Sequence, residues 1–540
     1  MQQNRYAIRY WVFALLLSLF SGFFTAANAD ESVLQAGIEN LLAKGFNQKI
    51  QGAKQVADSG DERAEQILKA LLDRQLFSVK SDDTLVFFDE DTDPTQAKQV
   101  ISGEMLPISD DVKLSRIRTN NKMRGQINQL LAQIQLSSPS AEKRLAAVKA
   151  ITGKADAEQV ELVSGLLKTE PDVLVQKEMQ TLISLSELSS DEPERVLAAI
   201  GHLKGNLNQL VRPRLESLTE SDNKQIANAA TQTLVSINEK VKWYGHLETL
   251  FFGLSLGSVL VLAAIGLAIT FGVMGVINMA HGELIMIGAY TTYSIQHYIL
   301  PNYPGIALVL SIPAAFIVAG LVGIVIEKTV IRHLYGRPLE TLLATFGISL
   351  ILQQAVRSIF SPLNRSVEAP SWMSGSIQVN EVLSLTLNRM YVIAFCLVVF
   401  TALFLVLKKT SLGLQVRAVS QNRGMARAMG VKASKVDAMT FGLGAGIAGI
   451  AGVALSQLTN VGPNLGQGYI IDSFMVVVFG GVGNLWGTLI SGFTLGVANK
   501  FMEPWAGAVL AKILVLVFII LFIQKRPRGL FPQKGRAAEN

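Results

Sequence analysis

The feature that most constrains this chain is a series of long apolar stretches in its C-terminal half. From about Leu250 onward, nearly uncharged stretches recur whose length approaches the roughly 20 residues that an α-helix needs to cross a bilayer. Within a bilayer only helices and closed barrels satisfy all of their own backbone hydrogen bonds. The stretches therefore predict an all-α, polytopic membrane helix bundle of about eight spans. The predicted spans lie near 250–271, 279–299, 305–326, 342–360, 390–407, 438–458 and 507–523.

One further apolar region, Tyr469 to Lys500, is less regular. It is interrupted by the segment Gly480-Gly481-Val482-Gly483-Asn484. Irregular backbone at membrane depth is tolerated only where protein or a water-filled cavity surrounds it. The region therefore forms either two short spans or a re-entrant hairpin, and the sequence leaves both open.

The distribution of basic residues predicts the orientation of the spans. Lys and Arg are concentrated in the connections 327–341 and 408–436 and after residue 524, whereas the connections 300–304 and 459–468 contain neither. An excess of Lys and Arg marks the cytoplasmic connections of a membrane protein. We therefore expect the basic connections and the C-terminal tail, 531–540, to be cytoplasmic.

The N-terminus predicts a secretory signal peptide over residues 1–29. Arg5 and Arg9 precede an apolar run, and Ala27-Asn28-Ala29 supplies the small residues that a signal peptidase recognises. The apolar run is shorter than the roughly 20 residues of a span, which favours cleavage over the alternative of an uncleaved anchor. Export of the following residues agrees with the topology, because the first span then runs from outside to inside.

Residues 30–245 predict an exported, mainly α-helical domain ahead of the transmembrane domain, 246–530. Amphipathic segments separated by polar turns recur from about Met123 onward, a pattern typical of a HEAT-like α-solenoid. A β-hairpin is predicted where Leu76–Val79 and Thr84–Phe88 flank a turn-like segment. We find no nucleophile–base pair and no metal-ligand cluster here, so we expect a docking or scaffold domain with no catalytic or metal site.

Polar residues within the apolar half are candidates for a solute pathway. Asn278, His281 and Glu283 lie in one apolar stretch, and Gln353 and Asn484 lie in others. A carboxylate in the membrane is costly and usually faces protein or water. Carboxylate and amide groups can also hydrogen-bond a neutral solute in passing. The alternative is that His281 and Glu283 lie at the cytoplasmic end of the second span and only satisfy a helix break.

Small residues predict where membrane helices pack closely. Gly442, Gly446, Gly449 and Gly452 fall on one face of a predicted helix. Lipid chains do not drive helices together, so small residues that let backbones approach favour packing. The sequence contains no phosphate-binding loop of the GxxxxGK[ST] kind, so we do not expect this chain to hydrolyse ATP.

Several motifs resemble the membrane permeases of the branched-chain amino acid ABC importers (LivH-like). They occur in the order that the family shows. The motifs are Ser255-Leu256-Gly257-Ser258, Gly272 to Glu283, Arg337-Pro338-Leu339, Gly413 to Val419, Ala428 to Val431, Gly480 to Gly487 and Arg526 to Phe531.

The resemblance implies a permease subunit of an ABC importer in the bacterial inner membrane, with the N-terminal domain in the periplasm. Such a subunit is not an enzyme and holds no cofactor, since ATP and Mg²⁺ bind to partner ATPase subunits. The implied partners are two ATPase subunits, a second LivM-like permease subunit and a periplasmic substrate-binding protein, with no nucleic acid.

The resemblance also implies that Ser411 to Val431 is the coupling loop that docks onto an ATPase subunit. The alternative is a solvated basic loop. The residues that we assign to coupling are Gly413, Arg417, Ala418, Gly424 and Gly430.

The exported extension departs from the family's usual member, which begins near this chain's residue 247. It resembles the extension of proteobacterial urea-importer permeases, and on that likeness we expect urea as the substrate. The alternatives are a permease for branched-chain amino acids or short amides, a passive urea channel, and a membrane-anchored scaffold.

Overall fold

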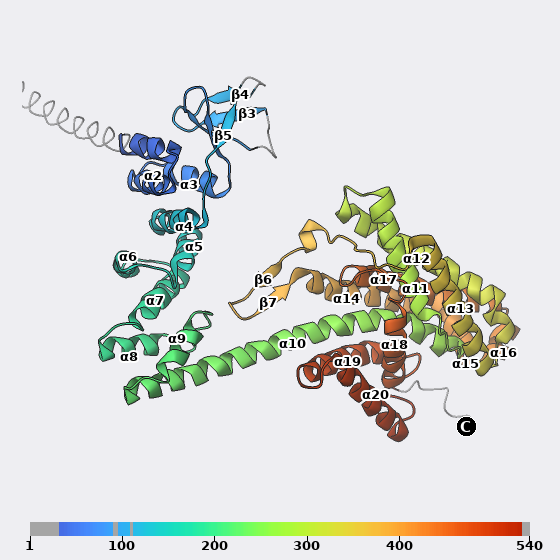
Figure 1. Cartoon of the computed structure of the whole chain (residues 1–540). Coiled ribbons are helices and arrows are strands. Elements are labelled where there is room, and N and C mark those ends of the chain that lie inside the picture. The colour runs from blue at the N-terminus through green and yellow to red at the C-terminus, as the bar shows by residue number, and fades with distance from the viewer. Residues whose placement is uncertain (1–31, 90–94, 109–111, 532–540) are drawn as a thin grey trace, which may run out of the picture. The chain divides into compact units, whose positions relative to one another are not determined.

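The computed structural model describes residues 32–89, 95–108 and 112–531, and Figure 1 shows their helices and strands. They form two compact units that divide between Asn238 and Glu239. The predicted signal peptide, 1–29, and all but the first residue of the predicted tail lie outside the described residues.

The first unit opens with short helices packed around an apolar core. These are a helix over 32–42, α2 (Phe46–Asp58), α3 (Ala64–Leu72) and α4 (Asn121–Leu136). The core that they share includes Leu34, Leu41, Ile67, Leu68, Met123 and Ile127.

Between α3 and α4 lies an antiparallel sheet of five strands in the order β4-β3-β2-β1-β5. The predicted hairpin is confirmed, because Leu76 pairs with Phe87 and Ser78 pairs with Leu85. The other three strands were not predicted, since they are short and lack a clear alternation of polar and apolar residues. The strands are β1 (Leu76–Val79), β2 (Leu85–Phe87), β3 (Gln96–Gln99), β4 (Met105–Pro107) and β5 (Leu114–Arg116).

The rest of the first unit is a stack of short helices, as the HEAT-like pattern predicts. Local signals set the helix starts: Asp156 forms a capping box with Gln159, and Asp172 accepts hydrogen bonds from the N–H groups of Leu174 and Val175. The helices are α5 (Ala141–Ile151), α6 (Ala157–Leu167), α7 (Val173–Glu187), α8 (Pro193–His202) and α9 (Val211–Leu218).

The second unit is a helix bundle, and the predicted all-α membrane architecture is confirmed. Among the described residues, six helices are long and apolar enough to cross a membrane. They are α10 (Lys224–Met274), which begins in the first unit and enters the second at Glu239, α12 (Pro304–Thr329), α13 (Pro338–Phe360), α14 (Leu387–Lys409), α17 (Ala433–Ser456) and α20 (Ala508–Lys525). Three further helices pack among them: α11 (His281–Ser294), α18 (Gln467–Gly480) and α19 (Leu485–Ala506).

The remaining elements lie in connections. They are the π-helix η1 (Ile295–Ile299), the 3-10 helices η2 (Ile331–Leu334) and η3 (Ser371–Met373), the paired strands β6 (Ser376–Gln378) and β7 (Ser384–Thr386), and the helices α15 (Ser411–Gln421) and α16 (Arg423–Ala428).

The connections between helices gather at two ends of the bundle. We call the first the basic end, because it carries most of the Lys and Arg residues of these connections. It consists of 330–337, 410–432, 481–484 and 526–531. The opposite end consists of 300–303, 361–386, 457–461 and Gly507, and its only basic residue is Arg365. The segments 276–280 and 462–466 lie between the two ends, where Gly282 packs against Gly466.

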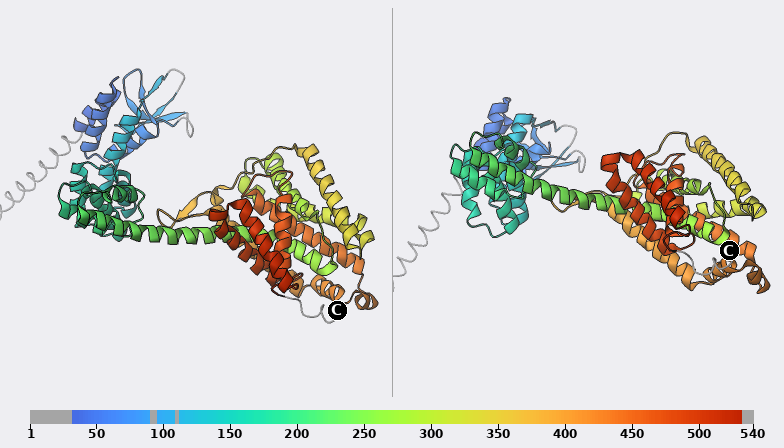
Figure 2. Two further views of the ribbon diagram at one scale, coloured as in Figure 1. Left: turned by 60° about the horizontal axis from the view of Figure 1, so that its bottom comes forward. Right: turned by 90° about the horizontal axis from the view of Figure 1, so that it is seen from below.

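The irregular region between Tyr469 and Lys500 is a pair of helices that reaches the basic end. Figure 2 shows α18, α19 and α20, drawn in red, side by side. The break between α18 and α19 contacts the C-terminal segment, where the Leu530 N–H donates to the Phe479 carbonyl over 2.9 Å. Gly481 and Gly483 have φ angles of 103° and 80°, which glycine adopts readily. The two helices are therefore antiparallel segments joined by a tight turn at the basic end.

The glycine face of α17 contacts α11 and α12 at backbone distance. A Cβ atom on Gly449 would lie 2.5 Å from the Ala315 carbonyl oxygen, and one on Gly446 would lie 2.6 Å from the Phe316 ring. Gly442 packs in the same way against Ile324, and Gly452 against the Ile285 carbonyl. These approaches require small residues, as the face predicts.

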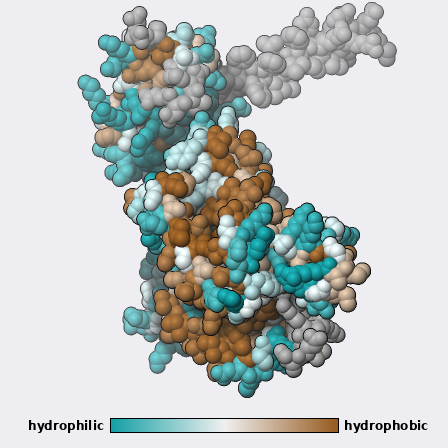
Figure 3. Space-filling model, turned by 90° about the vertical axis from the view of Figure 1, so that its right-hand side faces the viewer, coloured by the Kyte–Doolittle hydropathy of each residue, from teal (hydrophilic) through white to brown (hydrophobic). Residues whose placement is uncertain are grey.

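The outer surface of the bundle is apolar. Figure 3 shows a broad face of hydrophobic side chains over the membrane helices. Exposed residues on α12 and α13 include Val309, Ile317, Leu321, Leu343 and Ile351. An apolar surface of this extent suits contact with lipid rather than with water.

Candidate functional site

Helix α13 is polar on its buried side and apolar on its exposed side. Thr341, Thr345, Ser349 and Gln353 recur every four residues and are at most 6% exposed. Leu343, Leu350 and Ile351 instead lie exposed on the same helix. Because lipid cannot hydrogen-bond, a membrane helix turns polar side chains toward protein or a solute path. Residues spaced by four share one helix face, so these four form a stripe along α13.

The stripe faces α11, where it holds the carboxylate of Glu283. Oε1 of Glu283 accepts hydrogen bonds from Ser349 Oγ over 3.0 Å and from Gln353 Nε2 over 2.7 Å. Glu283 is only 1% exposed, and its Oε2 atom has no hydrogen-bond partner among the described residues. An unpaired buried acceptor costs about 1–3 kcal/mol, so Oε2 is a suitable place for a solute N–H group.

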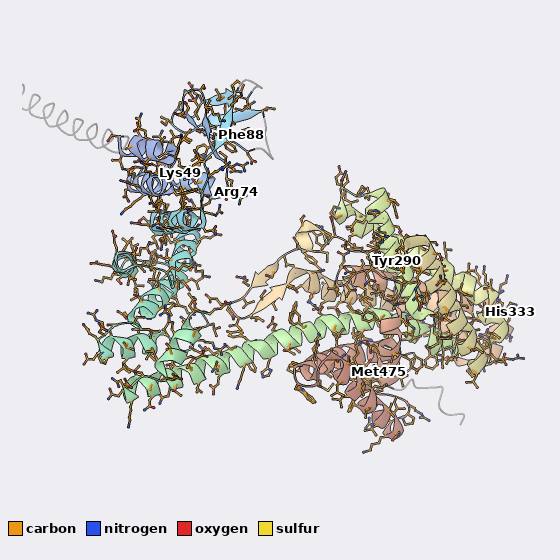
Figure 4. The ribbon with its side chains drawn as sticks, viewed as in Figure 1. Lys49, Arg74, Phe88, Tyr290, His333 and Met475 are labelled. Atoms are coloured by element: carbon orange, nitrogen blue, oxygen red, sulfur yellow. The ribbon has the colours of Figure 1, made fainter. Side chains whose placement is uncertain are left out.

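Two other buried polar atoms near this interface have no partner within the described part of the chain. They are Nδ2 of Asn278 and Oη of Tyr290. Glu283 and Tyr290 are seven residues apart, which places them on one face of α11 and about 10 Å apart along its axis at 1.5 Å per residue. Figure 4 shows Tyr290 inside the helix bundle and His333 at its rim.

We call this set of residues the polar seam. It consists of Asn278, Glu283, Tyr290, Thr345, Ser349 and Gln353. Its walls are α11, with the loop that precedes it, and α13.

A break between α10 and α11 positions the first wall. Gly275 ends the long helix with a φ of +68°, which the left-handed region allows glycine at little cost. Asn278 Oδ1 then accepts from the Ala280 N–H over 3.0 Å, and the Met279 N–H donates to Thr345 Oγ1 over 3.1 Å. The loop is thus bonded to α13, and α11 begins with Glu283 in its first turn.

The structure separates the five pathway residues that the sequence grouped together. Glu283 and Gln353 are directly bonded, and Asn278 lies in the loop that binds α13. His281 lies elsewhere, since its Nε2 atom is 2.8 Å from the Ala263 carbonyl of α10. Asn484 caps α19 by accepting from the Gly487 N–H, and it donates to the Phe531 carbonyl at the basic end.

Sequence reasoning missed Thr345, Ser349 and Tyr290. A signal for the first two was present, because hydroxyl and amide side chains recur every four residues from Thr341 to Gln353 in an otherwise apolar stretch. Nothing comparable marks Tyr290, whose position depends on the packing of α11 against α13.

The residues that we assigned to coupling lie on α15, α16 and the turn after them. Gly413 packs against the backbone of Leu407, and Arg417 donates to the same carbonyl. Ala418 is half-buried on α15, and Gly424 is exposed on α16. Gly430 follows with a φ of +86°. An apolar cluster of Val416, Val419, Ala426, Ala433 and Val436 joins these two helices to the start of α17.

A large cavity of the second unit lies at the basic end, beside α15. Its volume is about 640 Å³. Lys408 and Arg417 line it together with Gly272, Gly483 and Trp486. It is therefore distinct from the polar seam, which side chains of α11 and α13 fill.

Comparison with known proteins identifies relatives of the membrane half. Residues 249–523 match the family model described as branched-chain amino acid transport system / permease component. No solved structure matches the chain.

Curated relatives agree with this match. The chain is 31% identical over 298 residues to the high-affinity branched-chain amino acid transport system permease protein BraD of Pseudomonas aeruginosa, covering 53% of this chain and 96% of that protein. It is 29% identical over 294 residues to the corresponding protein LivH of Salmonella typhimurium, covering 53% and 94%. It is also 24% identical over 285 residues to the ribose import permease protein RbsC of Escherichia coli, covering 51% and 84%. Through residues 249–523, this chain belongs to the family of branched-chain amino acid transport system permease components.

Proposed function

We propose that this chain is the membrane-spanning permease subunit of an ATP-driven importer and that a small polar solute crosses along the polar seam. The observation that carries the proposal is the Glu283 carboxylate. One of its oxygens is held by Ser349 and Gln353, while the other is buried without a partner among the described residues. Relatives whose names denote transport permeases support the general role.

We take urea as the preferred solute. Urea is neutral, and it offers N–H donors to a carboxylate and a carbonyl oxygen to an amide donor. Glu283 Oε2 and Asn278 Nδ2 supply such an acceptor and such a donor, both buried and unpartnered in the described chain. None of the six residues that define the seam is basic, which suits a solute that lacks a carboxylate, although Arg357 acts electrostatically on Glu283 and Arg365 acts on Tyr290. The resemblance of the exported extension to that of urea-importer permeases supports the same choice.

A branched-chain amino acid is the second candidate, and the names of the curated relatives favour it. Its carboxylate needs a cationic partner. Arg357 follows Gln353 by one turn of α13, but its Nη2 atom donates to Asn464 over 2.8 Å. Binding of an amino acid at the seam would therefore require Arg357 to change partners.

The partners follow from the same proposal. Separate ATPase subunits would bind ATP and Mg²⁺ and would dock at α15 and α16 on the basic end. This end would face the cytoplasm, because Lys and Arg are enriched in cytoplasmic connections. A second permease subunit would complete the membrane pore. The N-terminal unit would lie in the periplasm and dock the substrate-binding protein.

The test is uptake by the complex reconstituted in vesicles with its cognate ATPases and binding protein. We expect ATP-dependent uptake of labelled urea that exceeds uptake of labelled leucine. Glu283→Ala should lower it at least tenfold, which corresponds to about 1.4 kcal/mol. Glu340→Ala is the matched control, because Glu340 is exposed on α13 and pairs only with Arg337 in the described chain.

Each other result has a defined meaning. Uptake of leucine but not urea would replace the preferred solute with the second candidate. Urea flux without ATP would favour a passive channel. Normal uptake by the Glu283→Ala complex would remove the seam from the transport path.

A further inference from the structure

Arg423 connects the α15–α16 segment to the membrane bundle through an ion pair. Its Nη1 atom donates to Oδ1 of Asp437 over 3.2 Å, and its Nη2 atom donates to Oδ2 of the same carboxylate. Arg423 is the first residue of α16, and Asp437 lies near the start of α17. The side chain of Asp437 is only 4% exposed. A two-pronged guanidinium–carboxylate pair fixes orientation as well as distance.

The same guanidinium also contacts the connection that precedes α13. Its central carbon lies 4.0 Å from the ring centroid of Tyr335, which stands between η2 and α13. A guanidinium over an aromatic ring is attracted by the ring's electron-rich face. One side chain of α16 therefore holds both α17 and the connection that leads into α13.

A second buried carboxylate makes the pair with Arg423 necessary. Glu327, at the end of α12, is 1% exposed and lies 3.4 Å from Arg332. It also repels the Asp437 carboxylate. Separation of Arg423 from Asp437 would leave the buried Asp437 carboxylate without its paired cation and beside a second buried carboxylate, Glu327, an arrangement that is strongly unfavourable. The α16 segment and the start of α17 should therefore move together.

Helix α17 in turn contacts the wall of the seam that carries Glu283. A Cβ atom on Gly452 would lie 2.6 Å from the Ala289 backbone nitrogen of α11, and Gly288 of α11 packs directly on Gly449. Close-packed backbones transmit a displacement because they leave no space to absorb it. Arg423 thus reaches α11 through Asp437, and it reaches α13, which carries Ser349 and Gln353, through Tyr335.

We propose that Arg423 is a positioning residue that couples movement of the α15–α16 segment to both walls of the polar seam. This inference rests on the proposed function, since it assumes that an ATPase subunit moves that segment. It adds a specific route: α16 pulls on α11 through Asp437 and α17, and on α13 through Tyr335. Separating or realigning the two walls would then break or reform the bonds from Ser349 and Gln353 to Glu283.

The first test compares variants of the full reconstituted complex. Arg423→Gln should lower ATP-driven uptake about tenfold while ATP hydrolysis continues, because the ATPase subunits then hydrolyse ATP without moving α11 and α13. Arg423→Lys keeps the charge but cannot bond both carboxylate oxygens in the same planar geometry, so it should retain only part of the uptake. The exchange Arg423→Asp with Asp437→Arg should restore more uptake than either single change. The matched control is Lys435→Gln, which removes an exposed charge from α17 outside the Ser411–Val431 segment.

A second measurement reports the connection without any transport. Spin labels on Met425→Cys of α16 and Leu339→Cys of α13 occupy exposed positions, in a chain whose buried Cys396 is replaced. The distribution of distances between the labels should be narrow while Arg423 and Asp437 are both present, and it should broaden in Arg423→Gln. An unchanged distribution in Arg423→Gln would overturn the inference, whether or not the complex transports.

The remaining outcomes separate the two proposals. Absence of ATP-driven uptake by the unaltered complex would overturn the proposed function and the coupling role together. Normal coupled uptake in Arg423→Gln, or an equal loss in Lys435→Gln, would overturn the coupling role alone. If the Arg423→Gln complex does not assemble, the exchange of Arg423→Asp with Asp437→Arg becomes the deciding test. Failure of that exchange to recover uptake would also overturn the coupling role.

Discussion

Gln353 donates a hydrogen bond to Glu283 over 2.7 Å and so joins two helices whose bonded residues are 70 positions apart in the sequence. The bond holds one carboxylate oxygen and leaves the other for a solute. A binding site for a small neutral molecule needs only a few such groups, and weak binding suits a protein that must also release its solute.

Gln353→Ala should reduce solute uptake by about tenfold, because Glu283 then loses one of its two described hydrogen-bond donors. A tenfold loss corresponds to a rise of about 1.4 kcal/mol in the free-energy barrier to transport. Gln354→Ala is the matched control, since Gln354 is the next residue on α13 and is exposed. Initial rates of uptake in reconstituted vesicles give the comparison. Equal rates for the two variants would show that the bond does not contribute to transport.

Deletion of Ser411 to Val431 should abolish ATP-dependent uptake and leave membrane insertion intact. The segment forms α15 and α16 and lies on the basic end, outside the membrane helices. Membrane extraction and protease protection measure insertion, and uptake in vesicles measures coupling. A deleted protein that still transports at the normal rate would contradict the docking of an ATPase subunit at this segment.

The two ends of the bundle should face opposite compartments. Leu414→Cys on α15 is 63% exposed and should react with a membrane-impermeant maleimide only in inside-out vesicles. Val379→Cys, in the connection 361–386, is 56% exposed and should react only in right-side-out vesicles. Both changes are made with the buried Cys396 replaced, so that only the new thiol can react. The reverse pattern would refute the topology.

Gly449→Ala should destabilise the bundle, whereas Gly347→Ala should not. A Cβ on Gly449 would lie 2.5 Å from the Ala315 carbonyl oxygen, which is backbone and cannot rotate away. At Gly347 on α13 nothing lies within 4 Å of the same atom. Overpacking typically costs about 1–3 kcal/mol of the free energy of unfolding. Thermal unfolding in detergent compares the two variants, and equal midpoints would contradict the close packing of α17.

The first unit should lose stability in acid through Glu170. Arg144 donates to both oxygens of this carboxylate, over 2.6 and 2.8 Å, and the hydrogen bonds lower the pKa of Glu170 below its usual value of 4.5. A group with a lowered folded-state pKa stabilises the fold above its unfolded pKa, and that stabilisation disappears as the pH falls through the folded pKa.

Hydrogen exchange of the α5 and α7 amides in the full chain, measured from pH 6 to pH 3, tests this expectation. After correction for the intrinsic exchange rates, protection should fall below about pH 4.5. Glu170→Gln should be less protected at pH 6 and should show a smaller loss in acid. An unchanged pH dependence in that variant would show that other carboxylates control the acid sensitivity.

Much of the architecture follows from local composition. Apolar length predicted the membrane helices, because a bilayer demands a fixed length of hydrocarbon surface and an internally bonded backbone. The glycine face of 442–452 likewise predicted close packing, because small residues along one face of a helix let a neighbouring backbone approach. The hairpin of Leu76–Val79 and Leu85–Phe87 was likewise visible as a local pattern.

The sequence also showed that Asn278, Glu283 and Gln353 are unusual in apolar surroundings, because a polar group in a membrane helix stands out wherever its partner lies. It did not show which of the polar residues meet. His281 and Glu283 are two positions apart on α11 and therefore point to different neighbours, one to α10 and the other to α13. Only the packing of helices distant in sequence decided that Glu283 binds Gln353 and that Arg423 binds Asp437, since such contacts depend on how helices rotate and cross rather than on the pattern along any one of them.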